Sequence, residues 1–148
     1  MRKPLLYGAL AVLYAIAVAG CDEKLSDLTG PTPNLEPTFR SIQQNIFEAG
    51  DPSGRVPCTQ CHNAIGSLFN GLNLTNAVAY SNLVNRSSVE RPGILRVAPG
   101  DPDASYLIHK VEGRAGIVGG RMPFNGPFLS GGQILVIKRW IELGANND

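Results

Sequence analysis

Two cysteines and a histidine stand close together in Pro57-Cys58-Thr59-Gln60-Cys61-His62, which has the pattern C-x-x-C-H. Two thiols at this spacing can add to the two vinyl groups on one edge of a haem, and the adjacent imidazole can bind the iron. On a helical turn, Cys58, Cys61 and His62 occupy positions i, i+3 and i+4 and project from one side. Pro57 suits the first position of such a turn. The motif predicts one covalent haem c on Cys58 and Cys61, with His62 as the proximal iron ligand.

Three other interpretations of this motif are open. A structural zinc site needs two further ligands at matching spacing, whereas the only other histidine is the isolated His109. A redox-active C-x-x-C follows a strand in a βαβ unit, and no such pattern precedes Cys58. The third interpretation is a chance occurrence in a short exported chain.

A second iron ligand is expected from methionine, because haem iron in electron carriers usually has two protein ligands and Met raises the reduction potential. Met1 is lost with the N-terminal segment described below, which leaves Met122. Pro123 favours an extended backbone at Met122, and glycines at 116, 119 and 120 let this loop cross the haem face. The alternatives are ligation by His109, an open or water-bound iron, and a packing role for Met122.

The first twenty residues have the pattern of a bacterial export signal. Arg2 and Lys3 precede an uncharged apolar run over 5–18, which is shorter than the roughly 20 residues of a membrane span. The run ends in Val18-Ala19-Gly20-Cys21, which resembles the lipobox of bacterial lipoproteins. We expect a signal peptide over 1–20, a lipid on Cys21, and a domain held on the periplasmic side of the cell envelope. An uncleaved anchor and ordinary cleavage nearby are the alternatives.

Composition limits the remaining possibilities. The 148 residues suffice for one domain, and lipid and haem together use all three cysteines, so no disulfide is expected. Removal of 1–20 leaves 11 basic and 12 acidic residues, a net charge of −1 that offers little long-range steering of a partner. No basic cluster with interleaved aromatics indicates nucleic-acid binding.

Residues 21–37 are polar and proline-rich, which predicts a flexible tether, and 38–148 then form the domain. The 17 glycines and 11 prolines indicate short helices joined by long ordered loops. Helices are expected over 38–49 with Thr38 as N-cap, over 76–84 after Thr75, from Asp101-Pro102 to Gly113, and from Ser130 or Gly131 to about Leu143. Helical spacing predicts these buried positions: Phe39, Ile42, Ile46, Phe47; Ala77, Tyr80, Leu83, Val84; Ala104, Leu107, Ile108, Val111; Ile134, Val136, Ile137, Trp140 and Ile141.

A set of short motifs occurs in a fixed order along the chain. They are Ile46-Phe47, the C-x-x-C-H motif, Gly71-Leu72-Asn73-Leu74, Pro99-Gly100-Asp101-Pro102, Ser105-Tyr106-Leu107, Arg121-Met122-Pro123, Leu129-Ser130 and Trp140-Ile141-Glu142-Leu143-Gly144-Ala145. The set resembles the small planctomycete-type cytochrome c domains within the class I cytochrome c fold, over roughly residues 39–145. The resemblance implies an all-α, cytochrome c-like fold that moves single electrons, with His62 as proximal and Met122 as distal ligand.

We therefore expect a membrane-tethered mono-haem c-type cytochrome, an electron carrier and not an enzyme. It would meet redox partner proteins transiently and use no small-molecule substrate. Two alternatives are a haem subunit of a larger periplasmic-side oxidoreductase, and a haem peroxidase or gas sensor in which Met122 dissociates.

Overall fold

The computed structural model describes residues 35–67 and 71–148. The expected signal peptide, Cys21 and most of the expected tether lie outside the described residues. At the end of that tether, Leu35 packs against the hydrophobic core, and the Glu36 backbone N–H donates to Ser41 Oγ at 2.9 Å. The packed part of the chain therefore already includes residues 35 and 36.

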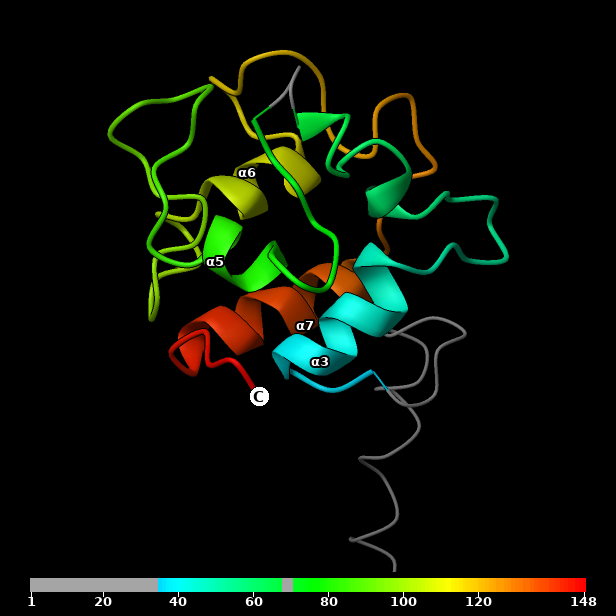
Figure 1. Ribbon diagram of the computed structural model, residues 1–148, viewed down its shortest axis with the longest axis horizontal. Coiled ribbons are helices and arrows are strands. Elements are labelled where there is room, and N and C mark those ends of the chain that lie inside the picture. The colour runs from blue at the N-terminus through cyan, green and yellow to red at the C-terminus, as the bar shows by residue number, and fades with distance from the viewer. Residues whose placement is uncertain (1–34, 68–70) are drawn as a thin grey trace, which may run out of the picture.

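Short helices and long connections make up the described part of the chain, in which no β-strand occurs (Figure 1). The helices are α3 (Phe39–Ile42), the π-helical η1 (Gln43–Phe47), the 3₁₀-helical η2 (Cys58–Gln60), α5 (Ala79–Leu83), α6 (Tyr106–Glu112) and α7 (Gly131–Glu142). This confirms the predicted all-α class. Within residues 35–67 and 71–148, no helix is long and apolar enough to cross a bilayer.

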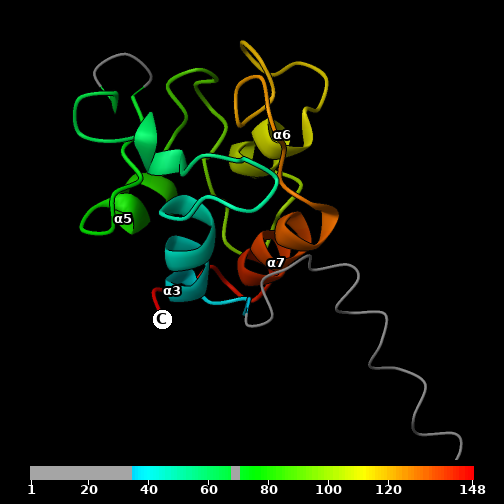
Figure 2. The ribbon, with the colours of Figure 1, turned by 90° about the vertical axis from the view of Figure 1, so that its right-hand side faces the viewer.

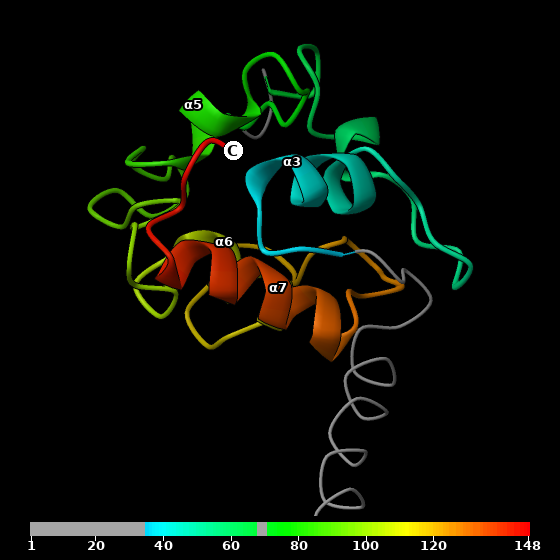
Figure 3. The same ribbon diagram turned by 90° about the horizontal axis from the view of Figure 1, so that it is seen from below.

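The first and last helices lie side by side, and α6 packs against α7 (Figures 2 and 3). Phe39 of α3 contacts Trp140 of α7 and, edge-on, Tyr80 of α5, with ring centroids 5.6 Å and 5.2 Å apart. Buried aromatic pairs of this kind contribute about 0.5–1.5 kcal/mol beyond their buried area. All the predicted apolar positions of the first and last helices are buried, as expected.

Local capping residues fix where these two helices begin. Thr38 Oγ1 accepts the Ser41 backbone N–H at 3.2 Å, as predicted for the N-cap of the first helix. Ser130 and Gln133 form a capping box at the start of α7, in which each side chain accepts the other residue's backbone N–H. Such a box satisfies two backbone donors that the helix itself leaves without partners. Helix α7 therefore begins at the predicted residue.

Helix α5 begins at Ala79, three residues later than predicted. The expected cap is absent because the Thr75 hydroxyl donates to Asn73 Oδ1 at 2.8 Å. Ala77 is consequently exposed, whereas Ala79 is fully buried. The prediction that Ala77 faces the core was wrong.

Helix α6 begins at Tyr106, and the expected start at Asp101-Pro102 is a separate turn. The Asp101 side chain accepts the Ala104 N–H at 2.9 Å, but the buried Ser105 hydroxyl donates to Asp101 O and accepts from Ala98 N–H. These bonds fix an extended residue at 105, which prevents the helix from starting earlier. The predicted burial of Ala104 was wrong, whereas Gly113 ends the helix at a φ of 73°, as predicted.

Candidate functional site

The C-x-x-C-H motif occupies one tight turn. The backbone N–H groups of Cys61 and His62 both donate to Cys58 O, at 3.2 Å and 2.9 Å. Pro57 was predicted at the first position of the turn. It instead occupies the N-cap position just before the turn, with an extended ψ of 140°. The three reactive side chains therefore originate from a single turn, as the i, i+3, i+4 spacing predicts.

This turn is attached to the end of the first helix. The last carbonyls of a helix have no partner within it. Here Ile46 O accepts the Cys58 thiol, with Sγ at 3.6 Å, and Phe47 O accepts the Thr59 hydroxyl at 3.3 Å. Burial at this position raises the pKa of the Cys58 thiol. The end of η1 thus determines where the motif lies.

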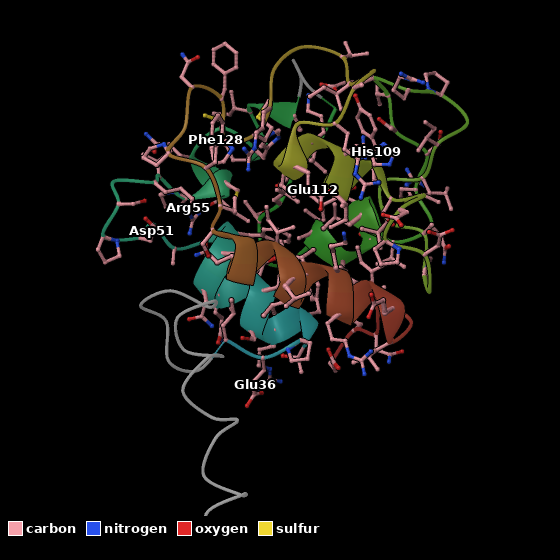
Figure 4. All side chains as sticks on the ribbon, turned by 180° about the vertical axis from the view of Figure 1, so that it is seen from behind. Glu36, Asp51, Arg55, His109, Glu112 and Phe128 are labelled. Carbon is pink, nitrogen blue, oxygen red and sulfur yellow. The ribbon has the colours of Figure 1, made fainter. Side chains whose placement is uncertain are left out.

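A buried arginine secures the loop between η1 and the motif. Arg55 is 2% exposed; its Nη1 donates to Ile46 O at 3.0 Å, and its Nε pairs with Asp51 Oδ2 at 2.9 Å. Arg55 Nη2 is also buried, with no hydrogen-bond partner among the described residues. Figure 4 shows Asp51 and Arg55 together on one side of the molecule. The guanidinium therefore depends on Asp51 for its charge partner.

We expect Asp51→Asn to lower the free energy of unfolding by about 3 kcal/mol at neutral pH, because it leaves a buried guanidinium without a counter-charge. Denaturant unfolding measures this loss. The control is Asp103→Asn. The Asp103 side chain is 77% exposed and pairs with Arg114, so its loss should change stability far less than Asp51→Asn does. Equal losses in the two variants would contradict the role assigned to Asp51.

The same pair predicts a pH dependence. Burial opposes ionisation of Asp51, but hydrogen bonds from Ser53 and Arg55 leave the pKa of this carboxyl below its usual 3.8. The ionised form therefore stabilises the fold fully above pH 3.8, and this contribution is lost as the pH falls through the lower folded-state value. The wild type and Asp51→Asn should thus differ most at neutral pH and converge in acid.

The loop between α6 and α7 carries Met122 (yellow to orange in Figure 2). The Met122 backbone N–H donates to Lys110 O at 2.9 Å, and Arg121 Nε donates to Val111 O at 2.8 Å. Gly113 leads into the loop at positive φ, and a Cβ there would come within 2.9 Å of the Arg121 side chain. The loop therefore runs back along α6, which brings Met122 beside that helix.

One cavity brings the four predicted haem residues together. It has a volume of about 340 Å³ and is lined by Cys58, Cys61 and His62 from the motif and by Met122 from the loop. Seven of the lining residues belong to the hydrophobic core: Ile46, Phe47, Leu74, Leu83, Val111, Leu129 and Ile137. Two thiols, an imidazole and a thioether thus line one largely apolar space, although Met122 follows His62 by sixty positions.

No protein-family model, curated protein or solved structure matches this chain.

The residues that line the cavity fit the group implied by the C-x-x-C-H pattern. Ligand pockets commonly have volumes of about 300–1,000 Å³, and haem iron takes a histidine nitrogen and a methionine sulfur as axial ligands. The cavity offers both atoms, two thiols from one turn and an apolar wall. Cys58 and Cys61 would form the thioether links, and His62 and Met122 would bind the iron.

His109, the alternative ligand, is not among the cavity-lining residues. Its Nε2 lies 2.6 Å from Asp103 O, and Figure 4 shows it on the side of the molecule opposite Arg55. Among residues 35–67 and 71–148, no group of three or more His, Cys, Asp or Glu side chains is arranged to hold a metal ion, so the zinc interpretation gains no support.

Polar residues also line the cavity, and their role could not be predicted from the sequence: Ser88, Glu90, Arg96, Tyr106 and Lys110. Lys110 is only 8% exposed, and its Nζ lies 3.0 Å from Glu90 Oε2. The spacing of Tyr106 and Lys110 by four residues places them on one helix face, which was the one available signal. Nothing in the sequence pointed to Glu90.

Proposed function

We propose that this protein is a membrane-tethered, mono-haem c-type cytochrome with a cytochrome c-like fold, which carries single electrons between redox partner proteins. The supporting observation is the shared apolar cavity, which collects Cys58, Cys61 and His62 from one turn and Met122 from a distant loop. Each of these side chains has the chemistry required of it for haem c.

The chain's own residues would make the site a carrier and not a catalyst. Cys58 and Cys61 would hold the cofactor covalently, and His62 and Met122 would both bind its iron, which would leave no iron position for a substrate. When bound, haem supplies a one-electron couple between ferric and ferrous iron. The thioether and the apolar wall disfavour the additional positive charge of the ferric state, which raises the reduction potential.

Exposed apolar residues at the cavity provide the surface for a redox partner. Val56, Val89 and Phe124 line the cavity and are 47%, 66% and 67% exposed. Electron-transfer partners bind through small interfaces, below about 1,200 Å² in total, that release quickly. Three apolar side chains at the opening suit such a brief contact.

Membrane attachment in this proposal comes from a lipid on Cys21. Residues between Cys21 and the packed segment at Leu35 would then separate the domain from the bilayer. The domain would operate on the periplasmic side of the cell envelope.

The deciding experiment is a redox-titrated visible spectrum of the mature protein, produced in a host that attaches haem c. We expect thioether-linked haem, the far-red absorption of a methionine-bound ferric iron, and a positive reduction potential. A colourless protein from such a host would overturn the proposed function. Haem without the methionine absorption would overturn the assignment of Met122.

A further inference from the structure

The loop that carries Met122 is bound to α6 through side chains as well as backbone. Val118 lies four residues before Met122, and both of its backbone polar groups are bonded to α6 side chains. Its N–H donates to the Tyr106 hydroxyl oxygen at 3.0 Å, and its carbonyl accepts from Lys110 Nζ at 2.7 Å. One residue of the loop is therefore fixed by two hydrogen bonds from one helix face.

A carboxylate from another segment joins the same network. Glu90 Oε2 accepts the Tyr106 hydroxyl at 2.9 Å and Lys110 Nζ at 3.0 Å. Burial raises the pKa of Tyr106, so its hydroxyl keeps the proton that it donates to Glu90. Tyr106 is 5% and Lys110 8% exposed, and a buried ammonium requires partners of this kind. We call Glu90, Tyr106 and Lys110 the polar clamp.

The polar clamp holds the loop beside two consecutive glycines. Gly119 and Gly120 follow Val118 directly, and Gly119 has a φ of 68°. Glycine imposes little restriction on the backbone, so these residues alone would let Met122 move. Beyond the two glycines, Arg121 Nε donates to Val111 O at 2.8 Å and the Met122 N–H donates to Lys110 O at 2.9 Å. Lys110 thus holds the loop at both ends of the glycine pair, by its side chain and by its backbone.

We infer that the polar clamp is a positioning device that keeps the Met122 thioether in the cavity. Glu90, Tyr106 and Lys110 act through the loop and are not iron ligands. This inference rests on the proposed function, in which Met122 is the distal ligand. It predicts that a weakened clamp raises the fraction of molecules in which Met122 has left the iron.

The test compares Lys110→Leu with Lys138→Leu in the haem-loaded protein, because leucine removes the charge and adds no atom that could bind iron. Lys138, on α7, pairs with Glu112 at the end of α6 at 3.2 Å, so its variant removes the same charge away from Val118. The measurement is the rate at which the ferrous protein binds carbon monoxide, which requires Met122 to dissociate. Because carbon monoxide is neutral, the loss of a lysine charge does not by itself change how strongly the site attracts it. We expect binding about tenfold faster in Lys110→Leu, the effect of one charge-assisted hydrogen bond, and unchanged in Lys138→Leu.

Tyr106→Phe tests the same inference with a smaller change, in case Lys110→Leu unfolds the domain. It removes one oxygen and keeps the ring, and it should raise both the carbon monoxide rate and the hydrogen exchange of the Val118 amide several-fold. A merely structural network would lower the melting temperature of both variants without changing the binding rate well below it.

The two proposals fail in different ways. Equal carbon monoxide rates in Lys110→Leu, Tyr106→Phe and Lys138→Leu, with the far-red absorption intact, would overturn the clamp. The proposed electron carrier would then be unaffected. Wild-type protein without haem, or without methionine-bound iron, would overturn the proposed function itself.

Discussion

Protein carrying Cys58→Ala and Cys61→Ala is expected to be colourless after purification and largely unfolded at 25 °C. The cavity lies within the hydrophobic core, because Ile46, Leu83 and Ile137 belong to both. Without haem, the apolar side chains that line the cavity would lose packing partners or face water, and both outcomes weaken the core. The net stability of a typical domain is only about 5–15 kcal/mol, so the loss of these contacts is expected to unfold most molecules. The cofactor would thus account for much of the folding free energy.

Far-UV circular dichroism and thermal unfolding measure this outcome. The control is Gln60→Ala, which changes an exposed side chain between the two cysteines and leaves both thiols in place. It should remain coloured and melt cooperatively. A cooperative transition with native-like helicity in the double variant would show that the core is complete without haem.

The first and last helices could be predicted because their signals are local. Thr38 and Ser130 supply caps within three residues of the donors that they satisfy, and the apolar stripes follow the helical period without interruption. The Cys58–His62 turn is equally local. Met122 was chosen for a different reason: it is the one methionine left if the N-terminal segment is removed. The structure places it in the same cavity as the Cys58–His62 turn.

The starts of α5 and α6 could not be predicted because polar side chains had competing partners. The Thr75 hydroxyl donates to Asn73, and the Ser105 hydroxyl bonds the backbone at 98 and 101. Short polar side chains can bond either to a helix end or to a turn, and sequence alone does not rank the two. Both helices therefore begin only after the competing turn is complete.

The burial of two charged side chains could not be predicted from the sequence, for a physical reason. Arg55 and Lys110 stand in a polar loop and on the polar side of a helix, where charged residues are normally solvated. Their burial depends on Asp51 and Glu90 and on carbonyl groups that only the folded chain brings near. Residues that secure the edges of the site were thus less predictable than those that would bind the cofactor.

Met122→Ala is expected to make the ferrous protein bind carbon monoxide roughly 10- to 1,000-fold faster than the wild type. The reason is a change in population: a minor open state typically accounts for about 0.1–10% of molecules, and removal of the thioether makes it the only state. The reduction potential should fall at the same time, because methionine ligation raises it. Stopped-flow mixing with carbon monoxide and a redox titration measure the two effects.

His109→Ala is the matched variant, since it removes the other side chain that could bind iron. His109 does not line the cavity, and its Nε2 lies 2.6 Å from Asp103 O, so carbon monoxide binding and potential should stay at wild-type values. Fast binding in His109→Ala together with slow binding in Met122→Ala would reverse the ligand assignment. Fast binding in the wild type would mean that Met122 does not hold the iron, which favours a gas sensor or peroxidase over a carrier. The pair of variants therefore tests whether the Met122 sulfur blocks external ligands from the iron, as expected of an electron carrier, or leaves a position free for them.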